Sequence, residues 1–239
     1  MIRTYHLYSN NLTELPQTQK LLITTLNAHC YNVTRKDSFY REALQKSDIL
    51  IPDGISIVWA ARWLQHERIK KIAGADLFFY ELNRLEQSNG KCFFLGSSEE
   101  TLQKITARIT REFPNIQIQT YSPPFKSEFS PEDNKAMLAT INSFQPDVLM
   151  VGMTAPKQEK WAYQHFNKLQ VGHICCIGAV FDFYAGTVQR APGWMISLGM
   201  EWLYRLIKEP RRMWRRYLIG NFKFIGYMVE EKIATLRSR

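Results

Sequence analysis

Short apolar segments that run into helix-start signals are the feature that most constrains this 239-residue chain. Four of these segments predict buried strands, at residues 48–51, 92–96, 147–152 and 173–178. Capping residues and a first-turn proline predict helices over residues 98–112, from residue 131 and over 157–168. Short strands that alternate with helices of this length are typical of βαβ units. The pattern therefore predicts an α/β fold in which helices cover both faces of a parallel sheet.

Polar and glycine-containing segments follow the predicted strands where each one ends, at residues 52–54, 96–98, 152–154 and 178–180. Ligands of parallel sheets bind beyond the carboxyl ends of the strands, so we expect these segments to converge on one rim. Asp53 is the preferred catalytic candidate there, because a half-buried carboxyl can have a raised pKa and act as a base. The competing interpretation is that Asp53 and Gly54 form an ordinary turn or helix cap.

Two further polar residues are candidates for binding a substrate. Gln158 opens the helix that follows Gly152, and a helix N-terminus offers free N–H groups and a positive dipole end to a diphosphate. An ordinary capped helix is the alternative for Gln158. Asp182 lies in an aromatic stretch, where it could accept a hydrogen bond from a ribose or sugar hydroxyl or cap a turn. The pattern does not separate these two roles.

Several common motifs are missing from the sequence. It contains no G-x-G-x-x-G, no G-x-x-x-x-G-K-[ST] and no Asp-x-Asp. We therefore expect arginines and backbone N–H groups to bind phosphate, with no metal and no cofactor. The four cysteines form no C-x-x-C pair and are predicted to be small buried hydrophobic residues: Cys30, Cys92, Cys175 and Cys176.

Positive charge is concentrated at the C-terminal end. The net charge is +9, and residues 190–239 hold eleven Lys or Arg against four Asp or Glu. Such a segment predicts a polyanionic partner: nucleotide phosphates, a nucleic acid or an anionic lipid surface. Because the composition changes near Pro192, we expect a core over residues 1–191 and a helical appendage over residues 192–239.

The basic segment interleaves arginines with aromatic residues on an amphipathic pattern. Pro210 should break one helix and start another, on which Arg212 and Arg215, three residues apart, are predicted to share a face. This favours a helix lying on a membrane surface, with a solvated basic face and nucleic-acid binding as alternatives. No signal-peptide pattern and no apolar run of about 20 residues is present, so a cytoplasmic location is expected.

Six segments in order resemble the WecG/TagA/CpsF family of bacterial glycosyltransferases. They are residues 25–27 (TLN), 52–54 (PDG), 74–77 (GADL), 152–161 (GMTAPKQEKW), 178–192 (GAVFDFYAGTVQRAP) and 198–217 (LGMEWLYRLIKEPRRMWRRY). Each motif alone is weak, but their order and spacing across nearly the whole chain are specific. One departure is Ile55-Ser56, where many members have Ile-Gly.

The resemblance implies a Rossmann-like core and an inverting, metal-independent transferase. The enzyme would move N-acetylmannosamine or a related hexose from a UDP-sugar to an undecaprenyl-diphosphate-linked acceptor in cell-surface polysaccharide synthesis. The expected partners are this donor, this acceptor and the anionic inner face of the cell membrane, with no nucleic acid. The oligomeric state, including a homo-oligomer, is left open. A nucleic-acid-binding protein and a non-catalytic membrane scaffold are the two alternatives.

The resemblance also implies roles for individual residues. Asp53 matches the family's proposed general base, and Thr25 and Asn27 match its polar neighbours. The appendage would close three arginines over the diphosphate: Arg205, Arg212 and Arg215. The substrate-binding positions expected within the matched segments are Asn27, Gly74, Asp76, Gly152, Gln158 and Asp182.

Overall fold

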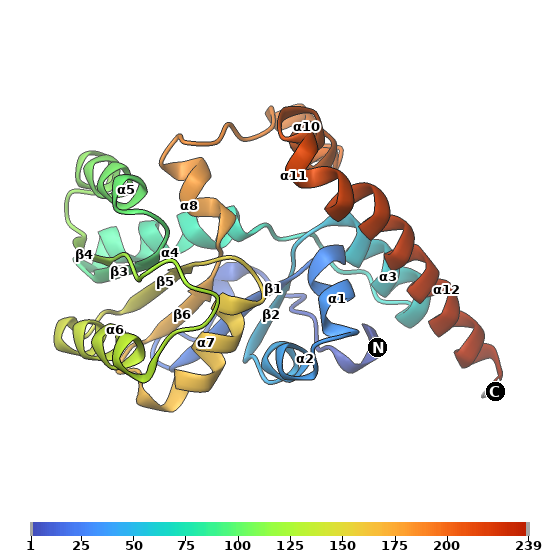
Figure 1. The fold of residues 1–239 in the computed structure, drawn as a ribbon, viewed down its shortest axis with the longest axis horizontal. Coiled ribbons are helices and arrows are strands. Elements are labelled where there is room, and N and C mark those ends of the chain that lie inside the picture. Colours follow the sequence, from blue (N-terminus) through green and yellow to red (C-terminus); the bar gives the residue numbers. More distant parts are fainter. Residues whose placement is uncertain (1, 238–239) are drawn as a thin grey trace.

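The computed structural model describes residues 2–237 and contains a six-stranded sheet in which every paired strand is parallel (Figure 1). The strand order is β2-β1-β6-β5-β3-β4. The strands are β1 (Leu21–Leu26), β2 (Ile49–Pro52), β3 (Lys91–Gly96), β4 (Gln117–Tyr121), β5 (Val148–Gly152) and β6 (His173–Cys176). The predicted α/β fold is confirmed, and the four predicted strands correspond to β2, β3, β5 and β6.

Two strands were not predicted. All six residues of β1 are buried, but two are threonines, so its sequence is not a continuous apolar run. The edge strand β4 has the polar sequence QIQTY and is at most half-buried. Strands of these two kinds lack the apolar signature from which a buried strand is identified.

Helices cover both faces of the sheet (Figure 1). One face packs against α4 (Gly74–Ser88), α5 (Glu99–Glu112) and α8 (Ala179–Tyr184). The other packs against α2 (Ser38–Gln45), α6 (Pro131–Phe144) and α7 (Lys157–His165), which the short helix η3 (Phe166–Lys168) continues. Cys175 and Cys176 enter the cores on opposite faces, and all four cysteines are free and buried, as predicted.

A third apolar cluster joins the C-terminal helices to the rest of the chain. It includes residues of α1 (Ala28–Thr34), α3 (Ile55–Gln65) and α12 (Gly220–Arg237). The α12 residues Phe224 and Met228 are buried in it. Both carboxylate oxygens of Glu231 accept hydrogen bonds from the backbone N–H of Ile2, at 3.1 Å each, so α12 is also tied to the start of the chain. Two short helices lie near that start: η1 (Ile2–Thr4) and η2 (Leu12–Glu14).

The segment between α8 and α12 folds into short helices over the carboxyl ends of the strands (Figure 1). They are α9 (Gly193–Ser197), α10 (Glu201–Lys208), α11 (Pro210–Trp214) and the π-helical turn η4 (Arg215–Ile219). Pro210 is the first residue of α11, as predicted. Among residues 2–237, no helix combines the length and the apolar character needed to cross a bilayer.

Candidate active site

A cleft of about 1750 Å³ lies at the carboxyl ends of the strands. Its walls are the loops that follow the strands, together with residues of α3, α8, α10, α11 and α12. All but two of the expected site residues line it: Thr25, Asn27, Asp53, Gly74, Gly152, Gln158, Asp182, Arg205 and Arg212. The rim predicted from the strand ends therefore exists, and the C-terminal helices form part of its wall.

Asp53 lies directly after β2, half-buried at the start of α3. Its N–H donates to the carbonyl of Leu26 at 2.9 Å, which extends the β1–β2 pairing to the rim. Gly54 then turns the chain into α3 with φ of 134°, a backbone conformation that glycine adopts without steric cost. The turn holds the carboxyl group of Asp53 at the cleft.

The ionisation of Asp53 is set by burial and by charged neighbours. Burial raises its pKa to about 6, and the negative charge of Glu201 adds to this shift. The positive charges of Lys71 and Arg216 and a hydrogen bond with Asn27 act in the opposite direction. A carboxyl with this pKa is largely ionised at neutral pH and is still basic enough to accept a proton, as a general base requires.

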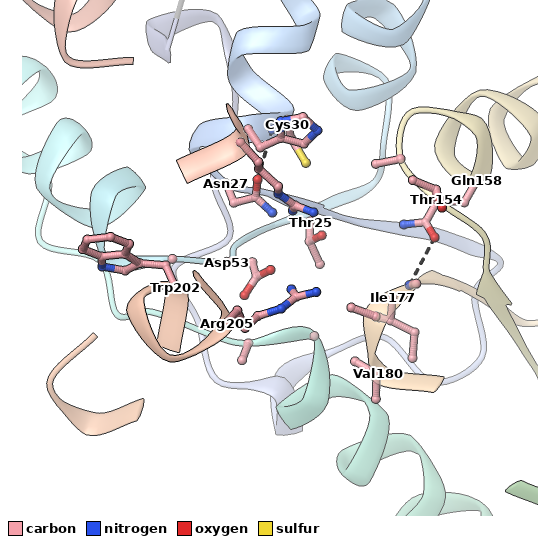
Figure 2. A pocket seen from close by; sticks show the side chains of 18 of the residues that line it. Thr25, Asn27, Cys30, Asp53, Thr154, Gln158, Ile177, Val180, Trp202 and Arg205 are labelled. Carbon is pink, nitrogen blue, oxygen red and sulfur yellow. Dashed lines mark hydrogen bonds between the residues drawn. The ribbon is translucent and has the colours of Figure 1, made fainter. Parts of the chain in front are cut away.

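Asn27 and Thr25 approach Asp53 from the neighbouring strand β1 (Figure 2). The side-chain oxygen of Asn27 accepts a hydrogen bond from the N–H of Cys30 at 3.0 Å and caps α1. This bond fixes the carboxamide, so its NH₂ group can face the Asp53 carboxylate. Thr25 is buried and lies opposite Ile51 in the sheet register, two residues before Asp53.

Gln158 joins the loops that follow β5 and β6. Its side-chain oxygen accepts a hydrogen bond from the N–H of Gly178 at 3.1 Å (Figure 2), and its NH₂ group donates to Glu159 at 2.7 Å. Gly152 and Gly178 permit this close approach. A Cβ on Gly152 would lie 2.3 Å from the Phe181 ring, and one on Gly178 would lie 2.6 Å from the Met153 carbonyl.

Asp182, on α8, faces guanidinium groups of the C-terminal helices. Burial raises its pKa, and the positive charges of Arg212 and Arg205 oppose this shift. The Arg205 guanidinium lies 5.4 Å from the centre of the Phe183 ring, and Arg212 pairs with Glu209 at 2.7 Å. α8 and the helices α10 and α11 therefore meet at a charged part of the cleft wall.

Half-buried arginines of the cleft have a buried Nε–H group without a hydrogen-bond acceptor. Within the part of the chain that the structure describes, no acceptor lies within hydrogen-bonding distance of Nε of Arg190, Arg205 or Arg216. Buried donors normally have partners. An anionic ligand in the cleft would supply acceptors for them, and guanidinium groups suit phosphate oxygens.

Two expected residues lie outside the cleft lining. Asp76 is exposed, and its carboxylate caps α4 by accepting a hydrogen bond from the N–H of Ala73 at 2.8 Å. Arg215 is also exposed, and its guanidinium lies 5.2 Å from the centre of the Trp214 ring. Arg216 lines the cleft instead. Residues three and four positions apart share a helix face, so both Arg215 and Arg216 are candidates to lie beside Arg212, and the structure places Arg216 at the cleft.

Sequence reasoning missed several titratable residues of the site, among them His29, Lys71, Glu201 and Arg216. Burial and the charge of Arg216 lower the pKa of His29 to about 4, so this imidazole is neutral at physiological pH. Glu201 begins α10 and lies 3.7 Å from Arg190. It belongs to a segment that resembles the family, but nothing in its spacing links it to Asp53. Within residues 2–237, no group of three or more His, Cys, Asp or Glu side chains is placed to hold a metal ion.

A carboxyl group poised to accept a proton, facing unpaired guanidinium groups at the rim of a parallel sheet, suits an enzyme that acts on a phosphorylated substrate. Comparison with known proteins fixes the class, and the chain is a glycosyltransferase. The sequence model described as "Glycosyl transferase WecG/TagA/CpsF family" matches residues 4–238. The chain belongs to this family.

Curated relatives agree with this assignment. One, from Bacillus subtilis (strain 168), is 32% identical over 211 residues, which cover 88% of this chain and 80% of the relative. Another, from Bacillus spizizenii, is 30% identical over a match that covers 86% of this chain and 78% of the relative. A third, from Staphylococcus aureus (strain MW2), is 27% identical over a match that covers 90% of this chain and 83% of the relative. All three are named N-acetylglucosaminyldiphosphoundecaprenol N-acetyl-beta-D-mannosaminyltransferase.

Proposed function

We propose that this chain transfers N-acetylmannosamine, or a closely related hexose, from a UDP-sugar to N-acetylglucosaminyl-diphosphoundecaprenol. The sugar and the acceptor are those in the names of the curated relatives. The observation that carries the proposal is the position of Asp53, a carboxyl with a pKa of about 6, in the same cleft as the arginines. This pairs a proton acceptor with a binding site for a leaving diphosphate.

The proposed reaction is a single displacement. Asp53 takes the proton from the acceptor hydroxyl while that oxygen attacks the anomeric carbon of the donor. The bond from this carbon to the diphosphate breaks, UDP leaves with the electron pair, and the configuration inverts. Asn27 holds the Asp53 carboxylate in place by their hydrogen bond. Thr25 lies beside them at the end of β1 (Figure 2).

The departing UDP gains negative charge, which Arg205, Arg212 and Arg216 would stabilise. Their guanidinium groups reach the cleft from α10, α11 and η4. This arrangement supports a metal-independent transfer, because cationic side chains then take the place of a divalent ion. Gln158 and Asp182 would contact the donor from the loops that follow β5 and β6.

We also propose that the chain acts at the cytoplasmic face of the membrane as a peripheral protein. One face of α12 is apolar yet exposed: Phe222, Ile225, Val229, Ile233 and Leu236. Their spacing puts them on one stripe of the helix; Ile225, at the edge of this stripe next to the buried Met228, also lines the cleft. Exposed basic residues lie on the same C-terminal helices, as on a surface that docks on anionic lipid: Lys208, Arg211, Arg215 and Lys223.

The test is transfer by the purified chain, with UDP-N-acetylmannosamine, a short-chain lipid-diphosphate-linked N-acetylglucosamine acceptor and a metal chelator. We expect a disaccharide of inverted anomeric configuration, identified by mass spectrometry and NMR. Asp53→Asn should lower kcat by about 10²–10⁴, the range for loss of a general base. A near-normal rate in Asp53→Asn would exclude that role. A strict requirement for added magnesium would contradict the metal-independent mechanism.

A further inference from the structure

Part of the cleft lining comes from the facing helices α3 and α12, and we call this part the α3–α12 arm. α3 contributes Trp59, Ala60 and Trp63 to it, while α12 contributes Phe224, Ile225 and Met228. These residues line the same cavity as Asp53. All six are uncharged, unlike the part of the lining that holds the arginines.

The arm starts beside the proposed base, because α3 begins two residues after Asp53. Ile55, Trp59 and Trp63 follow one another at intervals of four residues and so lie along one face of this helix. The rise of an α-helix places Trp63 roughly 12 Å beyond Ile55. An apolar wall therefore extends from the reacting centre toward the outside of the molecule.

The two walls of the arm differ in exposure. Phe224, Met228 and Ala60 are buried in the cluster that joins α12 to the rest of the chain, and they form a fixed floor. Trp59 and Trp63 are 67% and 46% exposed. Exposing two indole rings on adjacent turns of one helix is unfavourable in water unless something covers them. The floor is thus provided by the fold, and the upper wall is free for a ligand.

At the surface the arm adjoins a second hollow of about 350 Å³. Trp59 and Trp63 line both hollows, and the second one adds Arg62, His66 and Lys232. The Lys232 ammonium donates to the carbonyl of Trp63 at 3.1 Å and bridges α12 to α3 at this point. The outer end therefore combines exposed indole rings with cationic groups, which suits the boundary between lipid chains and anionic headgroups.

We propose that this arm binds the first isoprene units of the acceptor's polyprenyl chain. The inference rests on the proposed function, which places the acceptor hydroxyl at Asp53 and makes the acceptor's far end a long apolar chain. That chain needs an apolar exit from a polar cleft, and the α3–α12 arm is continuous with the cleft and leads outward. The arm then distinguishes a polyprenyl diphosphate from a diphosphate with a short polar substituent.

The first experiment measures binding without transfer. Farnesyl diphosphate and methyl diphosphate are titrated into the full chain, without vesicles, and binding is followed by tryptophan fluorescence and calorimetry. We expect farnesyl diphosphate to bind at least about tenfold more tightly, as burial of an apolar chain predicts. Trp59→Ala and Ile225→Ala should each reduce this preference severalfold. Both side chains are more than half exposed, so their truncation leaves the buried clusters intact.

The matched control is Phe39→Ala. Phe39 is an exposed aromatic residue on α2 that lies outside both hollows, so its truncation should leave the preference unchanged. Equal binding of the two diphosphates by the unaltered chain would overturn the proposal. Trp59→Ala and Ile225→Ala variants that both keep the full preference would also overturn it.

The second experiment separates this inference from the proposed function. The same N-acetylglucosaminyl diphosphate head group is supplied as a farnesyl ester and as a methyl ester, and KM is measured for each with UDP-N-acetylmannosamine. The arm predicts that Trp59→Ala raises the ratio of the farnesyl KM to the methyl KM severalfold, in line with the binding experiment. Transfer to both esters with equal KM would refute the arm and leave the transferase function standing. Failure to transfer to either ester would refute the function, while the binding preference still tests the arm.

Discussion

Asp53 is placed between neighbours of opposite charge, and each of them affects its readiness to accept a proton. Glu201 approaches from α10, whereas Lys71 belongs to the segment between α3 and α4. The negative charge of Glu201 raises the pKa of Asp53, and the positive charge of Lys71 lowers it. Since the proposed mechanism requires an ionised Asp53, it makes the rate depend on this balance of charges.

This balance predicts opposite shifts of the pH–rate profile. In the unaltered enzyme, kcat/KM should rise with pH through about 6, the pKa of Asp53. Glu201→Gln removes a negative charge, lowers that pKa and moves the rise to lower pH. Lys71→Met removes a positive charge and moves the rise to higher pH. Steady-state kinetics from pH 4.5 to 8, roughly the range that brackets this pKa, would measure both shifts; shifts in the same direction would contradict the assignment.

Among single residues, site residues close to the end of a strand are easier to identify from the sequence than site residues contributed by elements far away in the chain. Asp53 could be proposed because it lies just beyond a strand, where the sheet dictates the location of the site. Gln158 and Asp182 could be proposed because one opens a helix after a predicted strand and the other is an acid in an aromatic stretch. Glu201 and His29 could not, because their electrostatic neighbours, Asp53 and Arg216, lie in other elements. Pairing of charges across separate helices leaves no spacing pattern in the chain.

Helix geometry determines which arginine reaches the cleft. Arg215 and Arg216 both belong to the π-helical turn η4; Arg216 lines the cleft, while Arg215 lies over Trp214 on the exposed side. Helical spacing alone does not choose between these two arginines, because residues three and four positions apart both share a face with Arg212. The predicted C-terminal helices and the break at Pro210 are confirmed, and the extent of the predicted appendage stays a prediction.

The turn predicts different defects for two neighbouring arginines. Arg216→Ala should lower kcat by roughly 10- to 100-fold, the range for a lost hydrogen bond to a charged group. Its loss should also raise the pKa of Asp53, because the charge of Arg216 lowers it. Arg215→Ala should mainly weaken binding to anionic vesicles and raise KM for lipid-linked acceptors. Kinetics with soluble and vesicle-borne acceptors distinguish the two, and a larger loss of kcat in Arg215→Ala would contradict the observed register.

The contact between β5 and α8 predicts a sharp limit on side-chain size. Gly152→Ala would place a methyl group 2.3 Å from the Phe181 ring. We expect a loss of about 1–3 kcal/mol in the free energy of unfolding, the usual cost of overpacking. Gly226→Ala is the control, since its added Cβ on α12 meets nothing within 4 Å and should stabilise the helix by about 0.5–1 kcal/mol. Urea unfolding of both variants measures the difference, and an equally stable Gly152→Ala protein would contradict the contact.

On the scale of the whole molecule, the C-terminal helices present two different surfaces. Their inner side completes the cleft, and the outer stripe of α12 is apolar and exposed. Deleting residues 192–239 would therefore remove part of the cleft and uncover the cluster that holds Phe224 and Met228. Point substitutions on the stripe therefore test the proposed membrane attachment without the loss of structure that truncation would cause.

The stripe predicts vesicle binding that can be lost without unfolding. Phe222→Ser combined with Ile233→Ser should lower affinity for anionic vesicles by at least about tenfold, since each side chain loses apolar burial in lipid. Phe39→Ser, on the far helix α2, should have no effect. Cosedimentation with vesicles measures this binding, and repeating it at a second salt concentration measures the electrostatic contribution to the affinity. Unchanged sedimentation of the double variant would place the membrane contact elsewhere.

The hydrogen bonds between Glu231 and the backbone of Ile2 affect how the chain folds during synthesis. The helix that carries Glu231 also lines the α3–α12 arm, so this lining is bonded to a residue 229 positions earlier in the chain. These bonds can form only after residue 231 has been synthesised. A nascent chain that ends before α12 would contain all six strands but an incomplete cleft. A bulky tag fused close to Ile2 would disturb the contact of Ile2 with α12.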